Sequence, residues 1–381
     1  MDIINTNTIT TRAERNYVIV RIETEDGLVG WGDATLNGRE KAVEAALVEH
    51  ILPDLNGHDP SRIEDVWQMF FRNTYWRGGP VLNTALSGVD MALWDLKGKK
   101  ADLPVYDLLG GRTREYARVY QHCDATTLDR LVDNIETARD RGIDHYRINY
   151  RRDEGFDFDD FVVGADHVRE ELGPEPELLV EVHGRARPIE AARLAKRLEP
   201  HGLYFLEDPV RPENPDAFET VRRYSTTPLA MGELFSNPWE MLPLIERDLV
   251  DFVRADLAHV GGITPADKLA AVSEHHYTQT AFHAPGDISP IGQAATIHLD
   301  LSLPNFGVQE LCEHHTDVGP EVAEVFDGGA FFLEGEGALD VPDEPGLGID
   351  VDWEAAIERA DEYEREHFGD LRHPDGSVRS F

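Results

Sequence analysis

The chain has 381 residues, of which 73 are Asp or Glu and 36 are Lys or Arg, so its formal net charge is −37 at pH 7. This acidic excess argues against a nucleic-acid-binding protein that relies on phosphate contacts, and the 41% of hydrophobic residues argues against a disordered acidic protein. Acidic residues spread over the whole length indicate a halophilic source.

The sequence carries no pattern for export, membrane insertion or a disulfide framework. Its two cysteines, Cys123 and Cys312, form no CxxC pair. The first residues have neither the basic nor the apolar region of a signal peptide, and no apolar run is long enough for a membrane helix. We therefore expect a cytoplasmic protein that binds neither membranes nor nucleic acid.

Residues 1–112 predict an α+β domain. Apolar and polar residues alternate over 16–32 around Glu25, Asp26 and Gly27, which indicates a hairpin of two antiparallel strands at the start of the chain. Residues 33–55 begin with a loop of small polar residues and then show helical periodicity, which also appears in residues 63–76 and 82–101.

After residue 112 the pattern changes to short apolar strands that alternate with helical segments. The strand candidates are residues 117–122, 145–149, 178–182, 203–207, 228–233, 251–256, 279–283 and 305–310. Eight such strands are the number in a (β/α)8 barrel, which we expect over residues 113–339. A stretch rich in Gly and Pro follows, and residues 351–369 predict a final amphipathic helix.

Three of these strands end in a glutamate, and the glutamates follow one another at equal intervals. Glu181, Glu207 and Glu233 are spaced 26 residues apart, about the length of one βα unit. Parallel strands end on one rim of a barrel, so the three carboxylates should meet there and repel one another unless a cation lies among them. Hard oxygen ligands of this kind suit Mg²⁺. The alternative is that they are ordinary acidic strand ends in an acid-rich chain.

Several stretches along most of the chain resemble those of a known family. GDATLNGRE, YWRGGPV, ALWDLKGK, FLEDPV, HVGGIT, DISP and PNFGVQE are similar to the mannonate dehydratase subgroup of the enolase superfamily. The resemblance implies an α/β fold, a (β/α)8 TIM-like barrel, with an α+β capping domain formed by residues 1–112 and by 340–381 returning to it. It also implies Mg²⁺ held by Glu181, Glu207 and Glu233, although the family usually has Asp at the first position.

The superfamily removes the proton α to a carboxylate with the help of Mg²⁺. By resemblance, His183 is the general acid for the leaving hydroxyl, and Arg147 pairs with a catalytic tyrosine in the loop after the second strand. That loop is short and acidic here, and Tyr150 stands nearby at a different spacing. Asp256 and His283 resemble the dyad of mandelate racemase and galactonate dehydratase, which offers another base. Alternatively, Asp256 only closes a strand and His283 only binds substrate.

The resemblance also implies substrate contacts. The matching positions are Asn37, His122, Arg254, Asp287 and Glu310. The chain ends in Phe381, where the family has a tryptophan that enters the pocket, so this side of the pocket is expected to differ.

Together these residues predict a dehydratase that acts with Mg²⁺ on D-mannonate, D-gluconate or a related aldonate and forms a 2-keto-3-deoxy acid. One alternative is a racemase or epimerase, which needs two opposed bases. Another is a catalytically weak or inactive homologue that binds a sugar acid as a signal, which the shortened loop would allow. The resemblance further implies a homo-oligomer, either a dimer or an octamer.

Overall fold

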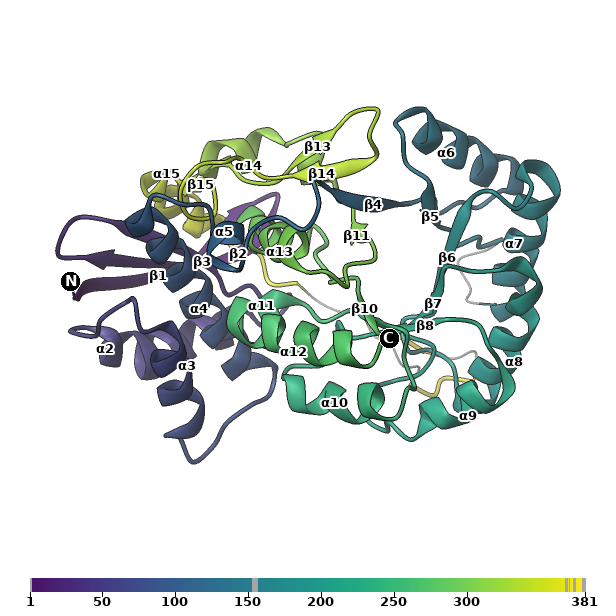
Figure 1. Cartoon of the computed structure of the whole chain (residues 1–381), viewed down its shortest axis with the longest axis horizontal. Coiled ribbons are helices and arrows are strands. Elements are labelled where there is room, and N and C mark those ends of the chain that lie inside the picture. The colour runs from purple at the N-terminus through teal and green to yellow at the C-terminus, as the bar shows by residue number, and fades with distance from the viewer. Residues whose placement is uncertain (1, 153–156, 367–368, 370, 373–374, 379–381) are drawn as a thin grey trace.

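The structure, a computed structural model, describes residues 2–152, 157–366, 369, 371–372 and 375–378. Within these residues the chain forms a barrel of parallel strands beside a smaller unit of antiparallel strands and helices (Figure 1). No helix in the described part of the chain is both long enough and apolar enough to span a bilayer.

The barrel strands follow one another in sequence order. Each strand from β4 to β10 pairs with the next, a parallel bridge between Thr280 and Phe306 continues the ring, and β11 pairs with β4 to close it. The strands are β4 (Ala117–His122), β5 (His145–Arg147), β6 (Glu177–Glu181), β7 (Phe205–Glu207), β8 (Leu229–Met231), β9 (Phe252–Val253), β10 (Gln279–Thr280) and β11 (Gln309–Glu310). Every predicted strand segment therefore contains an observed strand, and the predicted (β/α)8 fold is confirmed.

Helices surround the barrel and bury the outer faces of its strands (Figure 1). They are α6 (Leu128–Asp140), α7 (Phe158–Leu172), α8 (Pro188–Leu198), α9 (Ala217–Tyr224), α10 (Pro238–Glu246), α11 (Leu257–Val260), α12 (Ile263–His275) and α13 (Pro290–Ser302). A separate apolar layer fills the inside of the barrel and consists of Tyr120, Leu179, Phe205, Ala230, Phe252, Ala281 and Val308. Polar side chains lie beyond this layer, at the carboxyl ends of the strands.

The smaller unit begins with a three-stranded antiparallel sheet. The predicted hairpin corresponds to β2 (Arg15–Thr24) and β3 (Val29–Asp33), and the first strand, β1 (Ile3–Ala13), was not predicted because its Thr- and Asn-rich sequence lacks a clear apolar alternation. The helices that follow are α1 (Glu40–Ala46), a π-helical turn (Leu47–Ile51), α2 (Leu52–Leu55), α3 (Ile63–Arg72), α4 (Pro80–Ala101) and α5 (Val105–Leu108). The polar loop predicted at the start of 33–55 is present, and the helix predicted after it begins at Glu40 and is interrupted.

Helix α4 connects the sheet of this unit to the barrel. It packs so closely on β3 that a Cβ atom on Gly32 would lie 1.8 Å from the carbonyl oxygen of Gly88, which requires glycine at this crossing. On the other side of α4, Asp90 accepts a hydrogen bond of 2.9 Å from the backbone N–H of Thr264, in the first turn of α12. Burial raises the pKa of Asp90 to about 7. The two units therefore share a buried polar contact near the barrel mouth.

The chain after the barrel returns to the first sheet. Its elements are α14 (Pro320–Val325), β12 (Phe326–Gly328), β13 (Phe331–Leu333), β14 (Ala338–Asp340), β15 (Ile349–Val351) and α15 (Trp353–Glu358). Arg359 donates from Nε to the carbonyl oxygen of Arg12, at 2.6 Å, which ties this segment to β1. The helix predicted over 351–369 ends at Glu358 and continues as a 3-10 turn to Glu362, because acidic residues at a helix C-terminus oppose its dipole. The domain limits at 112 and 339 stay predictions.

Candidate active site

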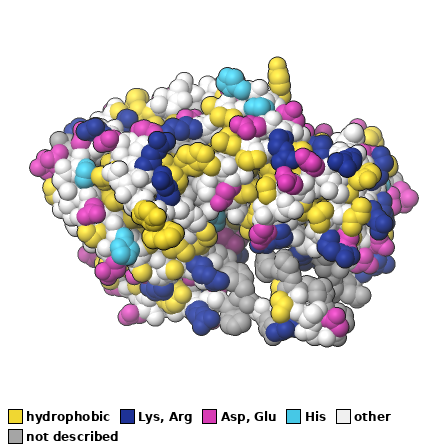
Figure 2. Space-filling model, turned by 90° about the horizontal axis from the view of Figure 1, so that it is seen from below, with side chains coloured by type: hydrophobic (Ala, Val, Ile, Leu, Met, Phe, Trp, Pro, Cys, Tyr) yellow, Lys and Arg dark blue, Asp and Glu magenta, His cyan; other side chains and the backbone are white. Residues whose placement is uncertain are grey.

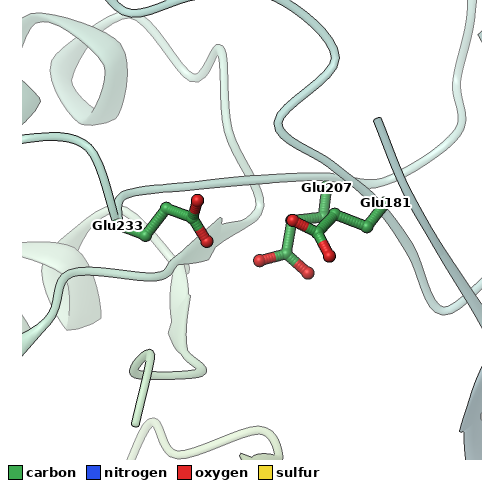
Figure 3. A group of neighbouring side chains, drawn as sticks. All are labelled: Glu181, Glu207 and Glu233. Atoms are coloured by element: carbon green, nitrogen blue, oxygen red, sulfur yellow. The ribbon is translucent and has the colours of Figure 1, made fainter. Parts of the chain in front are cut away.

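Three glutamates from neighbouring strands meet at the mouth of the barrel (Figure 3). Glu181 and Glu207 end β6 and β7 and are register partners, and Glu233 follows β8 by two residues. One carboxylate oxygen from each side chain lies within 4.8 Å of the others. Glu181 and Glu207 are buried and Glu233 is half-buried. The carboxylates therefore share one centre, as the equal spacing of the strands predicts.

Positive side chains flank part of this group. Arg147 of β5 forms an ion pair with Glu181, and Arg254, which follows β9, forms one with Glu207. His183 Nε2 lies 2.8 Å from Glu181 Oε1. Burial opposes ionisation of Glu181, but Arg147 and His183 outweigh it and hold its pKa at about 2. Glu181 is thus a charged carboxylate with its own counter-charges.

The other two carboxylates have less positive charge beside them. Burial raises the pKa of Glu207 to about 8; Arg254 acts in the opposite direction, and Glu181 and Glu233 add to the increase. Burial raises the pKa of Glu233 as well. Glu207 Oε2 and both carboxylate oxygens of the adjacent Asp208 are buried and have no hydrogen-bond partner among the described residues. A cluster of carboxylate oxygens, some of which have no hydrogen-bond partner among the described residues, fits a hard divalent cation.

Asp256 and His283 form a hydrogen-bonded pair next to the glutamates. Asp256 Oδ2 lies 2.8 Å from His283 Nδ1, and Asp256 Oδ1 accepts a 2.7 Å hydrogen bond from the backbone N–H of Ala258. His283 Nε2 lies 3.4 Å from Glu233 Oε2. Burial opposes protonation of His283, but Glu233 and Asp256 raise its pKa to about 10. Because Asp256 engages Nδ1, Nε2 is the ring nitrogen that faces the glutamates.

The turns after β6 and β7 hold His183 in a strained backbone conformation. His183 has a φ of 54° and Asp208 a φ of 41°, both in the left-handed region that costs about 1 kcal/mol or more for such residues. The backbone N–H of Gly184 donates to the carbonyl oxygen of Asp208 at 2.7 Å, so the two turns support each other. This arrangement directs the imidazole of His183 at Glu181.

The predicted substrate contacts lie in two groups. Glu310 joins three strand ends, because its oxygens lie 2.8 Å from His122 Nε2 and 3.1 Å from Arg254 Nη2. Burial opposes ionisation of Glu310, but His122 and Arg254 hold its pKa well below the usual range. In the second group, Asn37 donates from Nδ2 to Asp287 Oδ2 at 3.2 Å. The loop after β3 therefore meets the loop after β10.

Tyr150, a predicted catalytic residue, does not lie with these side chains. Asn149 Oδ1 accepts from the backbone N–H of Glu181 at 3.4 Å, which places it with Arg147 on the inner face of the barrel. Side chains alternate along a strand, so Tyr150 faces outwards and packs against Gly164 of α7 in the outer core. This placement does not support Tyr150 as a base. Phe381 lies outside the described residues.

Three polar residues that support the site were not predicted. Asp124 Oδ2 lies 3.4 Å from Arg147 Nη2, and Arg15 forms an ion pair with Asp287. The third is Asp208, which is fully buried beside the glutamates. Asp124 and Asp208 each stand within two residues of a strand end, a position that could have singled them out. Arg15 has no such signal, because it belongs to the first sheet.

Family models match most of the chain. Residues 5–110 match the N-terminal domain of mandelate racemase and muconate lactonizing enzyme, and residues 130–356 match the enolase C-terminal domain-like family. An α+β unit beside a barrel whose strand ends carry clustered carboxylates defines an enolase-like protein. The chain belongs to the enolase superfamily, with members like the mannonate dehydratases among its relatives.

Named relatives are similar over nearly the full length. A D-mannonate dehydratase of Caulobacter vibrioides is 41% identical and aligns over 99% of both chains. A D-galactonate dehydratase family member, RspA, of Pantoea ananatis is 42% identical over 95% of each chain. A crystal structure of an enolase from Pantoea ananatis with bound D-gluconate and Mg has a TM-score of 0.92, 41% identity and full coverage of both chains.

Proposed function

We propose that this protein is a Mg²⁺-dependent sugar-acid dehydratase, a hydro-lyase. It removes the C2 proton of an aldonate such as D-mannonate or D-gluconate and eliminates the 3-hydroxyl as water, which gives a 2-keto-3-deoxy acid. The observation that carries this proposal is the meeting of three strand-end glutamates with the His283–Asp256 pair. The names of the relatives, and the D-gluconate and Mg of the Pantoea ananatis structure, support the substrate class.

Glu181, Glu207 and Glu233 hold the magnesium ion in this proposal. Each offers one oxygen to a common centre, and Glu207 Oε2 is buried without a partner among the described residues. Magnesium bound there supplies a Lewis acid that stabilises negative charge developing on the substrate carboxylate. Arg147 and Arg254 hold Glu181 and Glu207 in place from the flanks.

His283 is the proposed base. Asp256 accepts the hydrogen bond from Nδ1, so Nε2 is the nitrogen that would take the C2 proton as the C2–H bond breaks. Glu233 is the first group that raises the pKa of His283, and a magnesium ion held by Glu233 would offset that charge and leave the imidazole neutral, with its Nε2 lone pair free. Asp256 is itself fixed by the backbone N–H of Ala258, so the ring keeps its orientation. With Tyr150 in the outer core, no tyrosine of the described β5 end competes for this role.

His183 is the proposed acid for the leaving group. Its Nε2 faces the glutamates at the barrel mouth, where it can donate a proton to the 3-hydroxyl. The C3–O bond breaks and the hydroxyl leaves as water, while a C2–C3 double bond forms. The resulting enol then becomes the 2-keto acid. One proton goes to His283 and one comes from His183, so the elimination is balanced.

The remaining polar residues orient the substrate. His122, Arg254 and Glu310 form one buried network at the strand ends, and Asn37 and Asp287 form another where the two loops meet. We assign the first network to the end of the substrate that reacts. We assign the second network to the hydroxyls farther along the sugar acid, because Asn37 and Asp287 lie in loops and not at the strand ends.

Incubation of the protein with Mg²⁺ and a panel of five- and six-carbon aldonates tests the proposal. Formation of a 2-keto-3-deoxy acid from at least one aldonate, lost on addition of a chelator, is the expected result. The sensing alternative is favoured by one observation, the outward placement of Tyr150. Calorimetric binding of an aldonate without any turnover would support that alternative and contradict the dehydratase.

An epimerase would need a second base opposite His283. The second base would be expected at the end of β5, where this chain has Arg147. Arg147 forms ion pairs with Glu181 and Asp124, which raise its pKa, although burial acts in the opposite direction. An arginine that stays protonated cannot accept the proton. Recovery of an epimerised aldonate in the same incubation would overturn this assignment.

A further inference from the structure

A fully buried carboxylate joins the smaller unit to the barrel. On the face of the molecule in Figure 2, Asp and Glu side chains are interspersed with Lys and Arg at the surface, where water solvates them. Asp33, the last residue of β3, is instead 0% exposed. Burial of a carboxylate is costly unless its oxygens accept hydrogen bonds. The partners of Asp33 therefore indicate its role.

Asp33 accepts one backbone hydrogen bond from each unit. Its Oδ1 accepts from the N–H of Thr35 at 2.8 Å, and its Oδ2 accepts from the N–H of Ser289 at 2.6 Å. Thr35 lies in the loop after β3, whereas Ser289 precedes the first residue of α13 in the barrel. Burial raises the pKa of Asp33, and these two hydrogen bonds act in the opposite direction. One carboxylate thus fixes the distance between two backbone segments that are far apart in the sequence.

The two anchored residues stand close to the side chains assigned to the far end of the substrate. We call Asn37 and Asp287 the rim pair, which is joined by the 3.2 Å hydrogen bond from Asn37 Nδ2 to Asp287 Oδ2. Asn37 follows Thr35 by two residues, and Asp287 precedes Ser289 by two. Both short segments lie in loops, so a shift of either anchor would move a member of the rim pair.

Other contacts across this junction are more exposed than Asp33. The Arg15 side chain, which pairs with Asp287, is 42% exposed. The His259 side chain is 18% exposed, and its Nε2 lies 3.2 Å from the carbonyl oxygen of Thr35. Water weakens exposed ion pairs, whereas a buried hydrogen bond to a charged group keeps its strength. Asp33 is therefore the firmest of these connections.

The packing around Asp33 leaves its carboxylate little room to move. A Cβ atom on Gly292, in the first turn of α13, would lie 2.7 Å from Asp33 Oδ2. The carboxylate thus lies directly against the barrel helix. A substitution at Gly292 would displace the carboxylate without altering its charge.

We propose that Asp33 is a positioning residue for the rim pair and so determines how tightly the site binds the hydroxyls beyond C3 of a sugar acid. This inference rests on the proposed function, in which Asn37 and Asp287 contact those hydroxyls. Two polar side chains recognise a fixed arrangement of hydroxyls only while their own separation is fixed. Asp33 fixes it through the backbone on both sides.

Calorimetric titration with D-gluconate in the presence of Mg²⁺ tests the effect on binding. Asp33→Asn places an NH2 group where one backbone N–H needs an acceptor, and Gly292→Ala displaces the carboxylate. Both variants should bind D-gluconate roughly tenfold more weakly, because a misplacement of about 1 Å is enough for such a loss. Where the protein turns over the aldonate, KM should rise by the same factor while kcat at saturation is largely kept.

Asp95→Asn is the matched control. Asp95 is also 0% exposed and accepts backbone hydrogen bonds from Trp31 and Leu347, at 3.0 and 2.9 Å, but neither residue belongs to the loops of the rim pair. This variant should keep the wild-type affinity for D-gluconate. In an Asn37→Ala background, Asp33→Asn should weaken binding less than it does in the wild type, because part of its effect passes through Asn37.

Hydrogen exchange followed by mass spectrometry measures the positioning without any ligand. Asp33→Asn should speed exchange roughly tenfold in peptides that cover residues 34–39 and 285–289, and Asp95→Asn should not. Unchanged exchange in these peptides overturns the inference even if the dehydratase activity is confirmed. Faster exchange together with weaker D-gluconate binding supports it, even if the wild type shows no turnover and the proposed function fails.

Three further results would overturn the inference. The first is wild-type affinity for D-gluconate in a folded Asp33→Asn variant, and the second is an equal loss of affinity in Asp95→Asn. The third is a wild-type protein that binds no aldonate, which contradicts the proposed function as well. Circular dichroism checks the fold of each variant, and if Asp33→Asn is unfolded, Gly292→Ala decides.

Discussion

The two sides of the barrel mouth balance their charges differently. On the side of β6, β7 and β8, three glutamates crowd one centre, and burial raises the pKa of both Glu207 and Glu233. On the side of β9, β10 and β11, each acid has a positive partner of its own. Burial opposes ionisation of Asp256 and Glu310, yet neighbouring histidines hold the pKa of both carboxyls below the ordinary value.

This difference indicates that the two sides have separate tasks. The glutamate side is incomplete until a cation offsets the repulsion among its carboxylates. The side with Asp256 and His283 is already paired and oriented, as a group that handles protons must be. Substitutions on the first side should therefore change metal affinity, and those on the second should change proton transfer while metal affinity is kept.

The largest effect is expected for Glu207→Gln. The amide keeps an oxygen that can accept from Arg254, but it removes the negative charge that binds the ion. Because a bound metal supplies several kcal/mol of transition-state stabilisation, dehydration should fall roughly a thousandfold or more. Calorimetry with Mg²⁺ should show the loss of affinity directly.

A matched control separates this effect from unfolding. Glu246→Gln makes the same change at an exposed position at the end of α10 and should leave Mg²⁺ affinity and turnover unchanged. Circular dichroism without metal checks that Glu207→Gln is folded, because the substitution also weakens the buried ion pair with Arg254. Unchanged Mg²⁺ affinity in Glu207→Gln would place the ion elsewhere.

His283→Asn and His183→Asn should divide the reaction into its two proton transfers. Loss of a general base or acid costs roughly 10²–10⁴-fold, so both should lose most dehydration. In deuterated water, His283→Asn should also stop exchange of the C2 proton, whereas His183→Asn should continue it, as NMR of the recovered aldonate would reveal. Exchange that persists in His283→Asn would assign the base to another side chain.

Asp256→Asn tests whether the paired side works through orientation. Asparagine has a single amide oxygen, and with that oxygen on the backbone N–H of Ala258 its NH2 group donates to Nδ1 and favours the tautomer with the proton on Nε2, so turnover should fall roughly tenfold to a hundredfold. Mg²⁺ affinity should stay near the wild-type value, in contrast to Glu207→Gln. A drop in Mg²⁺ affinity as large as in that variant would mean that the two sides are not separate.

The sequence was sufficient to predict the barrel and its clustered carboxylates. The apolar runs have the length of strands, and parallel strands of a barrel all end on the same rim. It could not decide which face a side chain takes just beyond a strand. Tyr150 illustrates this, since a shift of one residue reverses the direction of every side chain. The left-handed backbone at His183 and Asp208 could not be predicted either, because it depends on the hydrogen bond between the turns after β6 and β7. The ligand and catalytic roles of these residues stay predictions.

Asp208→Asn should have the smallest effect and the most specific one. Asp208 is fully buried, and its carboxylate oxygens have no partner in the described part of the chain, so it extends the negative charge beside Glu207. Asparagine tolerates the positive φ of 41°, which leaves the turn intact. We expect roughly tenfold weaker Mg²⁺ binding, as for other residues that act behind the ligands, with kcat at saturating Mg²⁺ largely retained. A variant that loses kcat but binds Mg²⁺ with wild-type affinity would show that Asp208 supports the chemical step and not metal binding.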